Sequence, residues 1–152
     1  QARASIDGSV LVVIAAALAL GQAMTDSGAA QIVADQLMQF GGGSPFLMLV
    51  LVYLTTTLFT EIITNNAAAV LMFPIAMAVS EQMGVSLMPY AIAIMFAASA
   101  SFLTPLGYQT NLMVMGPGGY KVSDYMKVGL PMSLIVGVTS VVLIPVIWPF
   151  TG

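Results

Sequence analysis

Long apolar runs, separated by short polar or glycine-rich segments, dominate this chain of 152 residues. Residues 9–25 form one run that approaches the roughly 20 residues of a membrane-spanning helix. Residues 46–80 and 89–116 are also largely apolar, but polar residues interrupt each of them, and residues 129–150 form a final apolar run. This pattern predicts an all-α membrane protein in which some helices cross the bilayer.

Two further segments have polar residues at helical spacing, which predicts amphipathic helices. We expect residues 29–40 to lie in the membrane interface and residues 120–128 to precede the last span. The polar members are Gln31, Asp35 and Gln39 in the first segment, and Lys121, Asp124 and Lys127 in the second.

The interruption of residues 46–80 is the sequence Thr60-Glu61-Ile62-Ile63-Thr64-Asn65-Asn66. A carboxylate and two adjacent amides at that depth would cost several kcal/mol if they were left unsatisfied in lipid. Polar residues inside a membrane segment therefore indicate an ion or substrate site. Residues 67–80 are short for a full span, so we expect residues 46–80 to form a re-entrant helical hairpin with this polar tip near the midplane.

The interruption of residues 89–116 runs from Thr104 to Asn111 and contains a proline and a glycine. Proline and glycine within a membrane segment predict a discontinuous helix. Both interruptions carry a Thr-Asn pair, Thr64-Asn65 in one and Thr110-Asn111 in the other. Freed carbonyls can coordinate a sodium ion, and freed amides attract an anion, so we expect the two interruptions to lie together and form one site.

Composition supports lipid as the main solvent, because only 6% of the residues are charged, against roughly a quarter in soluble domains. The chain has no His and no Cys, which removes the common transition-metal ligands and every Ser-His or Cys-His nucleophile. The enzyme class is therefore disfavoured. We expect a lipid bilayer and a small anion as partners, Na⁺ as coupling ion with no other cofactor, and no nucleic acid.

These residues resemble the divalent anion:sodium symporter family of the ion transporter superfamily. Thr64-Asn65-Asn66 is similar to the Ser-Asn-Thr hairpin tip of that family, and residues 104–111 are similar to its unwound loop. Residues 111–131 are similar to its segment before the last span. The resemblance implies that residues 1–152 are the C-terminal half of a longer protein, with an inverted N-terminal repeat upstream. It also implies a homodimer that works by an elevator mechanism.

The resemblance further implies roles for single residues. One half of the substrate site would consist of Thr64, Asn65 and Asn66, with Thr104 and Pro105 completing its wall. The ligands of one sodium ion would be Thr60, Ile63, Thr64, Asn65 and Leu103. The tip departs from the family pattern, because Asn66 replaces Thr and Thr64 replaces Ser, so sulfate-like oxyanions, dicarboxylates and tricarboxylates all remain open.

The interpretation that follows is one inverted-repeat half of a sodium-coupled anion symporter of the bacterial inner membrane. Two alternatives stay open. The first is a transporter of the same superfamily that couples to protons through Glu61, which could equally be a structural hydrogen-bond acceptor. The second is a membrane assembly module that transports nothing, in which Asn65 and Thr110 would face separate helices and share no polar cavity.

Overall fold

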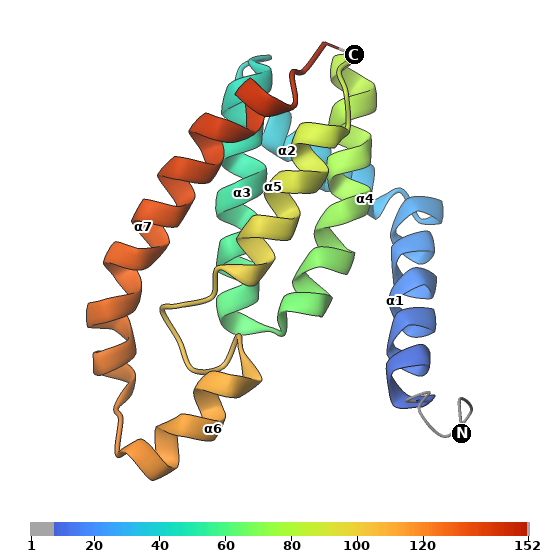
Figure 1. The fold of residues 1–152 in the computed structure, drawn as a ribbon. Helices are drawn as coiled ribbons and strands as arrows, with labels where there is room; N and C mark the ends of the chain where they lie inside the picture. The colour runs from blue at the N-terminus through green and yellow to red at the C-terminus, as the bar shows by residue number, and fades with distance from the viewer. Residues whose placement is uncertain (1–7, 152) are drawn as a thin grey trace.

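The structure is a computed structural model, and it describes residues 8–151 (Figure 1). Within this range the chain folds into seven helices and no strand, which confirms the expected all-α class. The helices are α1 (Gly8–Asp26), α2 (Ala29–Gly41), α3 (Pro45–Ile62), α4 (Asn65–Met83), α5 (Met88–Ser99), α6 (Gln109–Gly118) and α7 (Val122–Ile147).

Helices α3, α4 and α5 stand side by side and form the centre of the molecule (Figure 1). Helix α2 packs against α3 and α4, α7 slants along α3 and α5, and α1 contacts α2 and α4. The largest fully buried side chains of this core include Tyr90, Met48, Leu49 and Met72. Inside a membrane such residues stabilise the fold mainly by close van der Waals packing.

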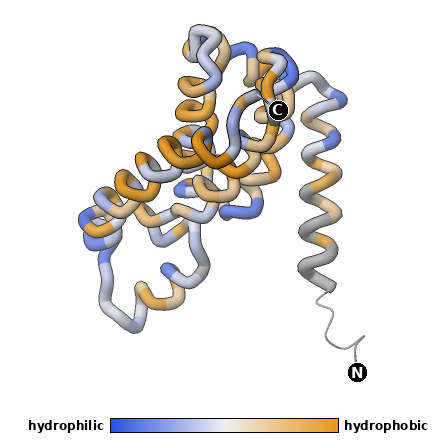
Figure 2. The backbone as a smooth tube through the Cα atoms, turned by 45° about the horizontal axis from the view of Figure 1, so that its top comes forward, coloured by the Kyte–Doolittle hydropathy of each residue, from blue (hydrophilic) through white to orange (hydrophobic). Residues whose placement is uncertain are grey.

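Apolar residues predominate along the helices, while hydrophilic residues gather at helix ends and connections (Figure 2). Large apolar side chains such as Leu134 and Val146 are exposed on α7. Among the described residues, α3 and α7 are both long enough and apolar enough to cross a bilayer, judged by length and composition.

The α3–α4 hairpin has recognisable start and stop signals. The Ser44 hydroxyl accepts the Leu47 N–H at 3.4 Å, and Pro45 occupies the first turn of α3, where its missing N–H costs no helical bond. Ile63 is extended, and the Thr64 hydroxyl then accepts the Ala67 N–H at 3.4 Å to begin α4. Gly84 ends α4 with a φ of 63°, a conformation that favours glycine.

Two helix boundaries differ from the sequence prediction. Helix α4 extends beyond the expected limb of residues 67–80 at both ends, because Asn65 and Asn66 form its first turn and the exposed residues Glu81 and Gln82 continue it after Ser80. At 1.5 Å per residue, α3 and α4 are each about 27–29 Å long, so a short second limb no longer supports the re-entrant prediction. Most residues of the expected segments 120–128 and 129–150 belong to the single helix α7 (Val122–Ile147), and Pro131 is accommodated inside it without a break.

The interruption after α5 also lies earlier than predicted. The non-helical residues are 100–108, whereas Thr110 and Asn111 belong to the first turn of α6. Tertiary hydrogen bonds explain the shift, because Glu61 accepts the N–H groups of Leu103 and Thr104, which a continuing helix would need for its own ladder.

Candidate functional site

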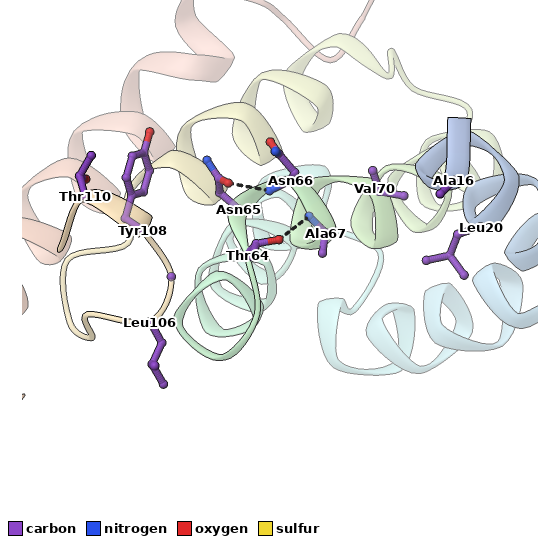
Figure 3. A pocket seen from close by; sticks show the side chains of 11 residues that line it. Ala16, Leu20, Thr64, Asn65, Asn66, Ala67, Val70, Leu106, Tyr108 and Thr110 are labelled. Atoms are coloured by element: carbon purple, nitrogen blue, oxygen red, sulfur yellow. Dashed lines mark hydrogen bonds between the residues drawn. The ribbon is translucent and has the colours of Figure 1, made fainter. Parts of the chain in front are cut away.

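A cleft of about 590 Å³ lies where the α3–α4 tip faces the segment that leads into α6 (Figure 3). One wall is formed by Thr64–Ala67 and the other by residues 106–108 with Thr110. Ala16 and Leu20 of α1 and Val70 of α4 close a third side. The two polar interruptions therefore lie together, as the sequence predicts, and Asn65 and Thr110 face a common cavity.

Two helix N-termini border this cleft. Helix α4 begins at Asn65, and α6 begins at Gln109 directly after the lining residue Tyr108. The first N–H groups of a helix have no partner within it, and the N-terminus carries a partial positive charge of about half an elementary charge. The α6 terminus has no side-chain cap, so its amides can serve a ligand.

The polar side chains at the tip are neutral and partly used by the turn itself. The side-chain oxygen Oδ1 of Asn65 accepts the Asn66 N–H at 2.8 Å (Figure 3). The donor end of the Asn65 amide is therefore the part that can face an anion. Among the described residues that line the cleft, none carries a charge, so an anion here would be held by dipoles and hydrogen bonds.

Three residues expected at the substrate site lie outside the described lining. The Thr104 hydroxyl donates to the Glu61 carbonyl at 2.8 Å, and Pro105 is buried. The Asn111 amide donates to the Ser101 carbonyl at 3.5 Å. Hydrogen bonds with neighbouring backbone therefore occupy the side chains of Thr104 and Asn111.

The expected sodium ligands divide between two environments. Thr64 and Asn65 line the cleft, whereas Thr60 is buried and its hydroxyl donates to the Ala98 carbonyl at 2.9 Å. Leu103 donates its N–H to Oε1 of Glu61 at 3.0 Å. Ile63 is the extended residue between α3 and α4. Thr60, Ile63 and Leu103 thus lie outside the described lining of the cleft.

Several residues that line the cleft are not among those predicted from the sequence. Tyr108 lies inside the polar interruption, and its aromatic ring in such a segment could have marked it as a candidate. Ala16, Leu20 and Val70 come from apolar helices and carry no sequence signal, because ordinary packing residues look the same.

A neutral cleft between helix termini, on a chain with an apolar exterior, is typical of a membrane transporter. The family model described as "Citrate transporter" matches residues 1–151. The chain therefore belongs to the citrate transporter family and is a multi-pass membrane protein.

The similar proteins include transporters whose names agree with the resemblance to divalent anion:sodium symporters. The uncharacterized transporter sll0640 of Synechocystis sp. is 41% identical over 145 residues, which cover 95% of this chain and 24% of the relative. The probable sodium/sulfate cotransporter 3 of Chlamydomonas reinhardtii is 37% identical, with coverages of 88% and 15%. The sodium-dependent dicarboxylate transporter SdcS of Staphylococcus aureus is 26% identical, with coverages of 92% and 27%. The chain thus spans about a quarter of the length, or less, of these relatives.

Proposed function

We propose that this chain forms the C-terminal repeat of a sodium-coupled secondary transporter that carries a small divalent anion across the membrane. The observation that carries the proposal is the cleft of about 590 Å³ between the N-termini of α4 and α6. Relatives named as sodium/sulfate and sodium-dependent dicarboxylate transporters support both the ion and the substrate class.

The anion would bind between the two termini. Both helices would direct the positive ends of their dipoles at the cleft, and the α6 terminus, which has no side-chain cap, would add free N–H groups. The side chains of Thr64, Asn65, Asn66 and Thr110 would add uncharged hydrogen-bonding groups. The absence of a basic side chain among the described lining residues favours moderate affinity. Such a site can release its substrate after the anion has crossed.

The sodium ion would bind at the end of α3, beside the anion. A helix C-terminus carries a partial negative charge and carbonyls without helical partners. Only Ile63 and Thr64 lie between the C-terminus of α3 and the N-terminus of α4. A sodium ion at the C-terminus of α3 and an anion near the N-terminus of α4 would attract each other. Each ligand would therefore strengthen the binding of the other.

We further propose the arrangement of the whole transporter. An inverted N-terminal repeat would supply the second half of the site, and two copies of the full chain would form a homodimer in the bacterial inner membrane. The transport domain would then move by an elevator mechanism. The α3–α4 pair would be a re-entrant hairpin. The cleft that Asn65 and Asn66 share with Tyr108 and Thr110 would give them the polar surroundings that they need within the bilayer.

The alternatives are less well supported by the geometry. Both carboxylate oxygens of Glu61 accept backbone N–H groups, which accounts for this side chain as a structural hydrogen-bond acceptor. Proton coupling through Glu61 is therefore disfavoured. The shared cavity of Asn65 and Thr110 argues against a purely structural assembly module.

Uptake by the full-length protein in liposomes tests the proposal. Labelled sulfate, a dicarboxylate and citrate would each be offered with an inward sodium gradient, with a proton gradient, and with neither. We expect one of the anions to accumulate only with the sodium gradient. Accumulation driven by the proton gradient alone would contradict sodium coupling, and no uptake of any anion would contradict the substrate class.

A further inference from the structure

The carboxylate of Glu61 has a position that substrate binding does not explain. Glu61 is only 6% exposed, and it is absent from the described lining of the cleft. It lies in the last turn of α3, immediately before the tip. Its Oε1 accepts the Leu103 N–H at 3.0 Å, and its Oε2 accepts the Thr104 N–H at 2.7 Å. Hydrogen bonds to a charged acceptor are roughly twice as strong as neutral ones.

Further hydrogen bonds join the same two segments in both directions. The Thr104 hydroxyl donates to the Glu61 carbonyl at 2.8 Å, and the Ser101 hydroxyl donates to the Thr60 carbonyl at 3.4 Å. The Thr60 hydroxyl donates to the Ala98 carbonyl at 2.9 Å. The last turn of α3 is thus fastened to residues 98–104 through groups on both sides.

Two glycines show how closely the loop of residues 100–108 is held. A Cβ at Gly107 would collide with the Thr60 carbonyl and the Ser101 hydroxyl. A Cβ at Gly129 of α7 would collide with the Phe102 carbonyl on the opposite side of the loop. The loop is therefore confined between α3 and α7, with no space for a methyl group at either glycine.

We infer that Glu61 is a positioning residue that clasps this loop to the hairpin tip and so sets the distance between the two walls of the cleft. One wall follows Glu61 directly in the chain, and the other follows Thr104. Because Glu61 holds both, the tip and the loop move as one unit. The consequence for transport rests on the proposed function, whereas the mechanical role does not.

Electron spin resonance on the full-length protein tests the clasp. Spin labels at Ile62 and Leu106, which are 65% and 59% exposed, would report the separation of tip and loop. We expect a narrow distance distribution in the otherwise unchanged protein and a broad one in Glu61→Gln, because the new NH₂ group would face a backbone N–H. Glu81→Gln is the matched control, since Glu81 is exposed on α4, and it should leave the distribution narrow.

Uptake separates a positioning role from a merely structural one. We expect Glu61→Gln to raise the half-saturating concentrations of sodium and of the anion together, by about ten- to a hundredfold, by the same factor at every pH. A pH dependence that disappears with the carboxylate would overturn the inference in favour of a titrating role. If the unmodified protein transports no anion, the proposed function fails, while the distance measurement still decides the role of Glu61.

Thr104→Val keeps the experiment decisive if Glu61→Gln does not insert. It removes the bond from the Thr104 hydroxyl and keeps the Thr104 N–H, so we expect a smaller broadening. A distribution that stays narrow in every Glu61 or Thr104 variant that inserts would overturn the clasp.

Discussion

Asn65 and Gly107 illustrate two different ways in which a single residue shapes the cleft. Asn65 contributes a polar group to the lining, whereas Gly107 contributes the absence of a side chain. The sequence pattern could predict the first, because an amide inside an apolar segment stands out. The sequence pattern could not predict the role of Gly107 or the hydrogen-bond partners of Glu61. Each depends on contacts between segments about 40 residues apart in the chain.

Replacement of Asn65 by Ala in the full-length protein should weaken both sodium and anion binding. Removal of a buried polar partner costs about 1–3 kcal/mol, which corresponds to roughly ten- to a hundredfold in affinity. Uptake titrations against each ligand measure the effect. Gln39→Ala, an exposed amide on α2, is the control, and equal uptake by the two inserted variants would refute a role for Asn65 in binding.

Replacement of Gly107 by Ala should destabilise the protein by about 1–3 kcal/mol, because the added methyl group must displace packed atoms. Gly116→Ala is the matched control, since nothing lies within 4 Å of a Cβ there and alanine favours a helix. Thermal unfolding in detergent compares the two variants. Equal melting temperatures would show that the loop can shift to accommodate a methyl group at Gly107, contrary to the close packing seen there.

At the scale of elements, hydrophobic periodicity located the helices, while their ends depended on tertiary contacts. The runs at residues 9–25 and 29–40 correspond closely to α1 and α2. The break after α5 could not be placed correctly, because Glu61 takes backbone N–H groups from residues that look helical in the sequence. Helix α7 was divided wrongly, because a change from amphipathic to apolar character need not interrupt a helix.

The depth of the hairpin tip remains a prediction, and it can be measured at Ile62. A spin label on this exposed residue should be accessible to oxygen as residues deep in the bilayer are, if the tip is re-entrant. Labels at Phe46, near the start of α3, and at Leu134, in the middle of α7, provide references for shallow and deep positions. A shallow result at Ile62 would show that α3 and α4 cross the whole membrane.

At the scale of the molecule, the chain presents a cleft with walls from α4, the loop of residues 100–108 and α6, and a third side from α1. Residues 1–151 match a transporter family, and the chain covers about a quarter of the length of relatives such as sll0640. Both observations are consistent with the proposal that the chain is one part of a longer transporter. The resemblance to the divalent anion:sodium symporter family already implied that the chain is one of two repeats. It could not supply the cleft volume or the share contributed by α1.

The isolated chain of 152 residues should therefore transport nothing. In inverted-repeat transporters the site lies between two repeats, each of which contributes its own hairpin and interrupted helix. This chain would supply one such repeat and therefore half of the site. Liposomes that contain this chain should accumulate no anion under a sodium gradient, while liposomes with the full-length protein should. Accumulation by the isolated chain would show that the second repeat is dispensable.

The loop of residues 100–108 has a further consequence for hydrogen exchange. Amides in a loop usually exchange quickly with solvent deuterium, because no ladder of bonds protects them. Here Leu103 and Thr104 give their N–H groups to a buried carboxylate. Their amides should exchange as slowly as those of the adjacent α5, so an irregular segment would behave in solution like part of the rigid core.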